Sequence, residues 1–315
     1  MLALCSLCIG PPAHTIPTPR FVATFPFLRV PLCSVFHLLL ALRPRHNGSL
    51  RAAIGVTPSL RHFYPLPMLH AAVILCGCGR SDGSEITEAV STLMHLSRHG
   101  VTYTCFAPPG AQRHVVNHMT GQEEAGQGRA GAGGRDMMAE AARISRGNMH
   151  SLAELDVAKF HMLLFPGGFG AAKNLCTFAF DGVHMTVRDD VQRIILAFHA
   201  AKKPMGFICI APIIAAKVLG TQNTINGKPG PGLSLTLGVD NVEKNPGGAA
   251  AAATMFGNTH RHCTTREAVT DSVNRVVTTP AYMDDAATPH DVYLGIGKCI
   301  DEVVAMARRA LPASV

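Results

Sequence analysis

Short apolar segments alternate with helical patterns along this chain, and this alternation limits the folds that it can adopt. Residues 70–75 form an almost continuous apolar run, as do residues 160–165, and neither has the regular polar positions of a strand with one face in water. Strands buried on both faces are typical of parallel sheets covered by helices on both sides. The pattern therefore predicts an α/β fold: a doubly wound, flavodoxin-like, mostly parallel sheet with helices on both faces.

The expected elements follow from the same pattern and from the residues that interrupt it. Ser84 is expected to cap a helix that starts at Glu85, and Gly100 ends that helix. We predict further strands at 101–107, 233–237 and 276–279, helices at 85–99, 135–146, 187–202 and 291–310, and loops at 221–232 and 246–253. A segment rich in glycine and alanine at 121–134 is predicted to be a flexible insertion.

One cysteine lies where a strand should turn into a helix. Residues 203–217 indicate a strand, a sharp turn and a helix, with Cys209 on the turn. Pro212 follows three residues later and suits the first turn of a helix. The positive end of the helix dipole favours thiolate over thiol, so this nucleophile elbow predicts a reactive cysteine. A buried, inert core cysteine is the alternative.

The positive charge of the chain is concentrated near its start. The formal net charge is +7, but residues 1–70 hold six of the 28 basic residues, all arginine, and no acidic residue. The remaining 22 basic residues are matched by 21 acidic ones in residues 71–315, so this part of the chain is nearly neutral. A basic face for phosphate binding is therefore not expected, and we predict no nucleic-acid partner.

The first 69 residues have the composition of a targeting signal. A segment that is free of acidic residues, carries arginines and is rich in Ser, Thr and Pro is typical of an organellar transit peptide. We predict a cleavable, largely disordered leader at 1–69, a mitochondrial location and one folded domain at 70–315. A secretory signal or anchor at 30–42 is the main alternative, and a wrongly joined upstream sequence is another. The apolar run at 30–42 is shorter than the ~20 residues that a membrane-spanning helix needs, so stable membrane insertion is not expected.

The ten cysteines show no regular framework, which favours a reducing compartment without disulfides. The pairs at 5 and 8 and at 76 and 78 have no second pair at zinc-finger spacing. We therefore predict no metal site and no cofactor.

Three glycine-bearing turns expected at one edge of the sheet resemble motifs of a known family. They are GSEITEAV at 83–90, PGGFGAAKNL at 166–175 and GFICIAP at 206–212. Together they resemble the ThiJ/PfpI superfamily, which has the class I glutamine amidotransferase-like fold. The stretches NHMTG at 117–121, EAARISRG at 140–147 and VTTPAYM at 277–283 resemble its ElbB-like branch. The similarity covers about residues 70–310.

The resemblance implies a site built around Cys209. The first motif resembles the one that carries the family's buried glutamate, and its spacing to the helix end favours Glu88, with Glu85 as the other choice. A carboxylate beside a thiolate would repel it, so the glutamate should be protonated and donate a hydrogen bond to sulfur. Negative charge on a substrate oxygen would be met by backbone N–H groups. The candidates for that role are Gly167, Gly168 and Ile210.

The sequence departs from the active amidotransferases at Ile210, where many relatives have histidine. Glutamine hydrolysis and proteolysis are therefore not expected. Further candidate site residues are His118, Asn174 and His260. The resemblance implies a glyoxalase-like or deglycase-like enzyme that acts on small dicarbonyls without a cofactor, as a homodimer. The alternative is a non-catalytic redox-sensing or metabolite-binding protein, and the sequence leaves the choice open.

Overall fold

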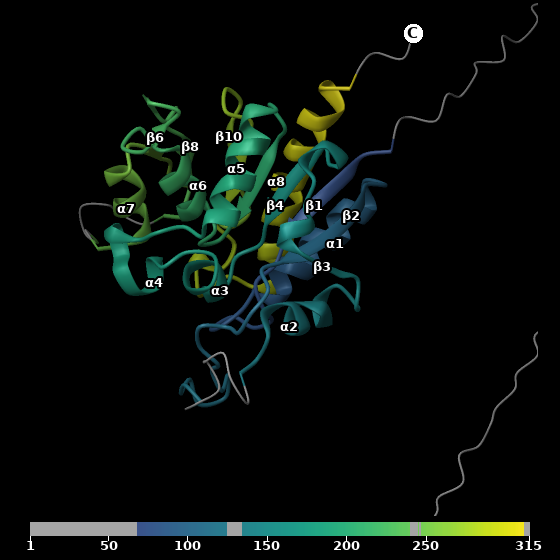
Figure 1. Cartoon of the computed structure of the whole chain (residues 1–315), viewed down its shortest axis with the longest axis vertical. Coiled ribbons are helices and arrows are strands. Elements are labelled where there is room, and N and C mark those ends of the chain that lie inside the picture. The colour runs from purple at the N-terminus through teal and green to yellow at the C-terminus, as the bar shows by residue number, and fades with distance from the viewer. Residues whose placement is uncertain (1–67, 125–133, 240–244, 246, 312–315) are drawn as a thin grey trace, which may run out of the picture. The chain divides into compact units, whose positions relative to one another are not determined.

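The computed structural model describes residues 68–124, 134–239, 245 and 247–311 (Figure 1). Apart from Met68 and Leu69, the predicted leader at 1–69 lies outside these residues. Most of the predicted insertion at 121–134 also lies outside them.

A seven-stranded sheet forms the centre of the described domain. Its strand order is β10-β11-β5-β4-β1-β2-β3, and every neighbouring pair is parallel except β10 with β11. The strands are β1 His70–Ile74, β2 Thr102–Ala107, β3 Met149–Ser151, β4 Met162–Phe165, β5 Met205–Ile208, β10 Val269–Asp271 and β11 Val276–Thr279. This sheet confirms the predicted doubly wound α/β fold.

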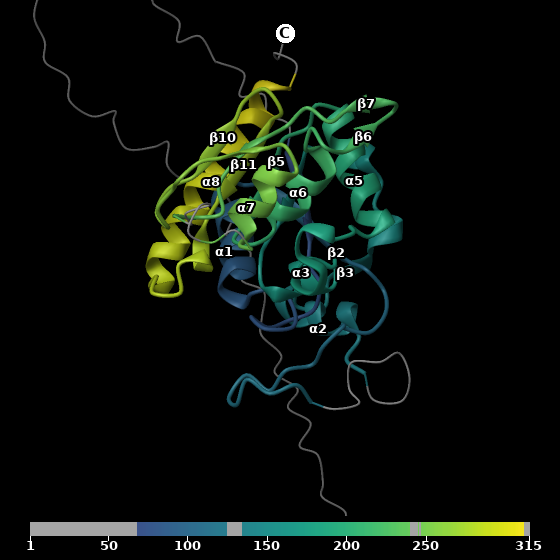
Figure 2. The same ribbon diagram turned by 90° about the vertical axis from the view of Figure 1, so that its left-hand side faces the viewer.

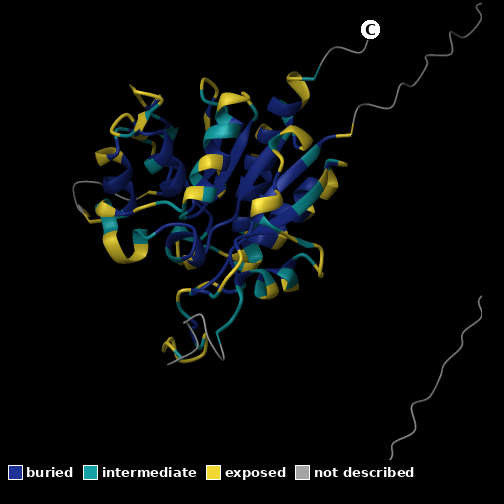
Figure 3. Cartoon of the chain, viewed as in Figure 1, coloured by how far each residue is buried: buried dark blue, intermediate teal, exposed yellow. Residues whose placement is uncertain are grey.

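Alternate residues of the central strands enter two separate apolar cores. In β4, Leu163 and Phe165 belong to one core and Met162 and Leu164 to the other, as the two-residue period of a strand requires. Figure 3 shows these strands buried beneath helices on both sides. The sequence lacks polar alternation here because both faces of the sheet are covered.

Helices cover each face of the sheet. The first face is covered by α1 Ile86–Arg98, α2 Met137–Ile144 and α8 Pro289–Arg309, and α1 packs along α8 (Figure 1). The second carries α3 Phe169–Lys173, α4 Phe178–Asp181, α5 Asp189–Ala200, α6 Pro212–Leu219 and α7 Ala249–Met255. Short 3₁₀ turns lie at Leu152–Glu154, Val157–Lys159, Gly182–His184 and Ala281–Met283. No helix in these ranges has the length and apolar character to traverse a bilayer.

The predicted loop at 246–253 is wrong, because α7 starts at Ala249. Its five alanines are all buried, and α7 packs against α6 (Figure 2). Alanine has the highest helix propensity and needs little space, so this segment forms a helix close to its neighbour. The predicted loop at 221–232 contains a small hairpin of β6 Thr224–Ile225 and β7 Lys228–Pro229.

The predicted strand at 233–237 is shorter than expected and lies outside the main sheet. It contains β8 Ser234–Leu235, which pairs with β9 Thr259–His260 in a two-stranded sheet. Ser84 does not cap α1 as predicted: its hydroxyl accepts a hydrogen bond from the Cys76 N–H at 3.0 Å, and Glu85 is the cap.

Candidate active site

Cys209 lies on a strained turn between β5 and α6. Its φ is 60°, in the left-handed region that costs a non-glycine residue roughly 1–2 kcal/mol. The turn is held in place because the Cys209 N–H donates to the Thr279 carbonyl oxygen of β11 at 2.9 Å. Pro212 begins α6 three residues later. The predicted strand, turn and helix are thus present, with the cysteine at the carboxyl end of a central strand.

Glu88 meets Cys209 from the first turn of α1. The glutamate is fully buried, and its carboxyl and the Cys209 thiol lie close enough to shift each other's pKa. Its two carboxyl oxygens also accept backbone hydrogen bonds, Oε2 from Gly167 N–H at 3.0 Å and Oε1 from Tyr282 N–H at 3.3 Å. These contacts fix the carboxyl between three segments of the chain.

Gly167 is where these groups come closest. A Cβ at this position would lie 2.5 Å from Cys209 Cβ and 2.6 Å from Glu88 Oε2, so only glycine fits. The Cys209 side chain, the Glu88 carboxyl and the glycine turn therefore meet at Gly167, although they are far apart in the sequence.

The carboxyl of Glu88 is mostly protonated at pH 7. Burial raises its pKa to about 8, and the nearby Glu85 carboxylate contributes in the same direction. Hydrogen bonds from Cys209 and from the backbone of Tyr282 and Gly167 lower the pKa by less. A protonated carboxyl can donate a hydrogen bond to sulfur, as the sequence predicts for a glutamate beside the cysteine.

The pKa of the Cys209 thiol is higher than its position at a helix N-terminus predicts. Burial raises its pKa, Glu88 adds to the rise, and the backbone N–H groups of Gly168 and Ile210 oppose it. The prediction of a thiolate favoured by the helix dipole is therefore wrong, because loss of solvent outweighs the backbone donors. Cys209 is only 7% exposed, so a reactant at its sulfur has to be small.

The three predicted backbone donors have different partners. The N–H groups of Gly168 and Ile210 face the Cys209 thiol and lower its pKa, whereas that of Gly167 donates to Glu88 Oε2. An oxygen on a carbon bonded to the sulfur would lie close to the first two groups. Gly167 instead orients the carboxyl.

Glu85 has a separate role at the start of α1. Its Oε2 accepts a hydrogen bond from the Glu88 N–H at 2.7 Å, and its own N–H donates to the Gly167 carbonyl oxygen at 3.0 Å. Glu85 is therefore the helix cap and ties α1 to the glycine turn.

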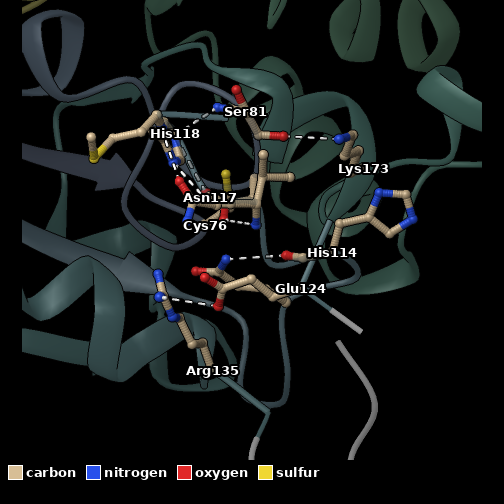
Figure 4. Close-up of polar contacts among 12 residues, drawn as sticks. Cys76, Ser81, His114, Asn117, His118, Glu124, Arg135 and Lys173 are labelled. Carbon is tan, nitrogen blue, oxygen red and sulfur yellow. Dashed lines mark hydrogen bonds and ion pairs between the residues drawn. The ribbon is translucent and has the colours of Figure 1, made fainter. Parts of the chain in front are cut away.

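The other candidate residues are engaged elsewhere. His118 Nε2 accepts from the Ser81 N–H at 3.2 Å (Figure 4), and its Nδ1 lies 3.0 Å from the Val116 carbonyl oxygen. His260 Nε2 accepts from the Leu237 N–H at 3.1 Å. In the part of the chain that the structure describes, no histidine is among the groups that perturb Cys209 or Glu88.

Asn174 connects three segments below the sheet edge. Its Nδ2 donates to the carbonyl oxygens of Cys76 and Asp82 at 3.0 and 2.9 Å, and its Oδ1 accepts from the Arg113 N–H at 2.9 Å. The side chain therefore fixes loops around the site and does not contact Cys209.

Sequence reasoning missed the contribution of Tyr282. Its backbone N–H reaches Glu88 because Ala281 has a φ of 47°, which turns the chain after β11. A backbone donor has no side-chain signal in a sequence. Within the described ranges, no three His, Cys, Asp or Glu side chains are grouped as metal ligands would be.

Comparison with known proteins found several close relatives. The chain is 42% identical over 257 residues to the human "Glutamine amidotransferase-like class 1 domain-containing protein 3, mitochondrial", covering 79% of this chain and 89% of that protein. It is 41% identical over 270 residues to the rat "ES1 protein homolog, mitochondrial", covering 84% and 92%. No protein-family model matches the chain.

A third relative and a crystal structure agree with these matches. The zebrafish "ES1 protein, mitochondrial" is 34% identical over 249 residues, covering 76% of this chain and 86% of that protein. An Ehrlichia chaffeensis isoprenoid biosynthesis protein with an amidotransferase-like domain is 34% identical, with a TM-score of 0.64, and the match covers 76% of this chain and 99% of that one. All three curated relatives are named mitochondrial, which confirms the predicted location.

Proposed function

Since the chain belongs to the ES1 family of mitochondrial glutamine amidotransferase-like class 1 proteins, within the ThiJ/PfpI superfamily, we propose that it is a glyoxalase-like or deglycase-like enzyme. In this proposal Cys209 is the nucleophile and the substrate is a small reactive dicarbonyl. The observation that carries the proposal is the convergence of Cys209 and the fully buried Glu88 carboxyl on one glycine, Gly167.

The proposed reaction on methylglyoxal needs no external oxidant or reductant. The Cys209 sulfur bonds to the aldehyde carbon while the thiol proton passes to the carbonyl oxygen, giving a hemithioacetal. Protonated Glu88 then gives its proton to the keto oxygen while its other carboxyl oxygen takes the proton from the sulfur-bearing carbon, which forms an enediol. In the reverse sense, Glu88 gives that proton to the former keto carbon and takes back the hydroxyl proton of the first carbon, so the first carbon becomes a thioester, the second an alcohol, and Glu88 is protonated again. Water cleaves the thioester and releases lactate and the thiol. In the deglycase variant, the Cys209 sulfur replaces the amine on the carbon that carries both a hydroxyl group and the amine. The carbon–nitrogen bond breaks, and the thiol proton leaves with the amine.

The protonation states support this sequence of steps. The thiol proton passes to the carbonyl oxygen as sulfur bonds to carbon, and the raised pKa of Cys209 makes this addition slower than it would be from a thiolate. The N–H groups of Gly168 and Ile210 are the proposed donors to the developing oxyanion. Among the described residues no histidine is hydrogen-bonded to Cys209, so this chemistry is better supported than glutamine hydrolysis. A redox-sensing thiol is the second candidate function, and the raised pKa of Cys209 slows both oxidation and carbonyl addition, so the test below decides between them.

Loss of methylglyoxal and formation of lactate by the full chain test the proposal. Wild-type protein should convert one into the other in equal amounts, and Glu88→Gln should lower kcat about 100-fold because an amide of similar size cannot relay the proton. Glu302→Gln, an exposed change on α8, is the control and should leave kcat unchanged. No lactate above the protein-free background would refute the enzyme, and full activity in Glu88→Gln would refute the relay.

An exposed apolar stripe on α1 supports the expected homodimer. Ile86, Val90 and Met94 are 49%, 38% and 52% exposed and recur every four residues, so they share one helix face. Replacing both Val90 and Met94 with glutamate is expected to halve the mass measured by size-exclusion chromatography with light scattering. Met255→Glu, at a 59% exposed position on α7, is the matched control and should remain dimeric. A monomeric wild type, or equal dissociation of the control, would contradict the interface.

A further inference from the structure

A cavity whose lining does not include Cys209 or Glu88 lies beside the end of α3. Its volume is about 490 Å³, in the range of small-molecule sites. The polar side chains that line it are those of Arg113, Lys173, Asn174, Thr177, Thr186, Arg188 and Asp189. They come from the segment after β2, from the end of α3 and from the residues up to the start of α5. None of them takes part in the proposed reaction at Cys209.

Two of the cations in this cavity have no carboxylate partner among the described residues. The guanidinium of Arg113 lies over the Phe180 ring, 4.8 Å from its centroid, and forms no ion pair with the described carboxylates. Lys173 Nζ donates to the Ser81 carbonyl oxygen at 2.8 Å (Figure 4), which leaves two of its three donors for other partners. Both side chains therefore retain hydrogen-bonding capacity, and the charge of Arg113 has no carboxylate against it.

Burial makes the charge of Lys173 costly as the protein stands. This half-buried side chain has a pKa lowered by loss of solvent, and the carboxylates of Asp82 and Glu123 offset that effect only in part. An anion beside the ammonium would stabilise its charged form. The third cation, Arg188, is already paired, since Asp190 accepts from its Nε at 3.1 Å and from its terminal nitrogen at 2.9 Å. Asp189, also in the lining, is exposed.

Asn174 holds the two free cations in fixed relation to each other. It follows Lys173 directly, and its Oδ1 binds the backbone N–H of Arg113 at 2.9 Å. Its Nδ2 is anchored on two carbonyl oxygens of the loop after β1. Since the Asn174 amide uses its donors and its acceptor in these bonds, the backbone at Arg113 and at residues 173–174 is held in place before any ligand binds. This lowers the entropy cost of binding.

We propose that this cavity binds a small organic anion that carries carboxylate or phosphate groups. Arg113 offers the planar, forked donor set that fits either group through two hydrogen bonds, and Lys173 supplies a point charge from the end of α3. The Thr177 and Thr186 hydroxyls in the wall can accept or donate to the remaining oxygens. The size of the cavity suits a molecule larger than a bare ion.

Calorimetric titration of the full chain with succinate and with inorganic phosphate tests this site. We expect saturable binding of at least one of them, weakened about tenfold or more in Arg113→Met and in Lys173→Met, since each removes one charged partner. If only succinate gives saturable binding, the site is assigned to carboxylate ligands. If only phosphate does, it is assigned to phosphate ligands. Dimethyl succinate, which is neutral, should not bind.

Two controls separate a local site from general charge. Arg143→Met removes an exposed cation on α2 that is paired with Glu140 outside the cavity, and it should bind like the wild type. Cys209→Ser should also bind normally, because the site is independent of the proposed reaction. The melting temperature of each variant without ligand establishes that it is folded. Absence of saturable binding by both anions, or binding that is equal in wild type, Arg113→Met and Lys173→Met, would overturn the proposal.

Discussion

Cys209→Ser is expected to lower kcat/KM for methylglyoxal at least ~1,000-fold, to the level of the protein-free reaction. A serine hydroxyl is a far weaker nucleophile than a thiol, and the thioester that the proposed mechanism hydrolyses would be replaced by an ester. Serine is slightly smaller than cysteine and tolerates the same turn, so the domain should remain folded. The measurement is lactate formation at equal concentrations of wild type and variant, with melting curves recorded for both.

Cys78→Ser is the matched control for this expectation. Cys78 is half-buried at the same edge of the sheet, and burial is the main cause of its raised pKa, as it is for Cys209. It makes no hydrogen bond to Glu88, so its removal should leave kcat/KM within about twofold. If Cys78→Ser lost activity while Cys209→Ser kept it, the nucleophile would be misassigned.

The elbow was predictable because its signals are local. An apolar strand, a cysteine and a proline three residues later define strand, turn and helix within one short segment. The choice between Glu85 and Glu88 was harder, since both lie near the start of one helix and three residues apart share a face. The structure separates them through the backbone: one carboxyl caps the helix, and the other points at sulfur.

The protonation of Cys209 could not be predicted from the same segment. The helix N-terminus is visible in the sequence, but desolvation depends on α1, β11 and the glycine turn, which pack around the sulfur from distant parts of the chain. The same limit applies to α7. Its alanines indicate a helix by propensity, whereas the adjacent glycines favoured a loop, and only contact with α6 decides between them.

The edge strands β3 and β10 were missed for a related reason. Each is three residues long and has partly exposed positions, so neither carries a continuous apolar run. Their pairing with β2 and β11 is a tertiary property. The central strands were predicted because burial on both faces makes nearly every residue in them apolar.

The buried carboxyl of Glu88 should make the wild-type protein less stable as the pH rises from about 4.5 to about 8. The pKa of this group is raised from 4.5 to about 8 in the folded state. Between these values the unfolded chain has lost the proton while the folded chain keeps it, so the unfolded state binds fewer protons and the free energy of unfolding falls with pH. The loss approaches about 1.4 kcal/mol for each pH unit across this window and stops near pH 8.

Glu88→Gln should remove this slope, because an amide does not titrate. Its stability carries a constant offset, since an NH₂ group replaces an oxygen that accepts from Gly167 or Tyr282. The difference in unfolding free energy between wild type and Glu88→Gln, from guanidinium titrations at pH 5, 6, 7 and 8, should therefore shift in favour of the variant as the pH rises. For the exposed change Glu302→Gln, the same difference should stay flat. Parallel curves for wild type and Glu88→Gln would mean that Glu88 ionises normally, and a carboxylate beside Cys209 cannot donate the hydrogen bond on which the proposed chemistry depends.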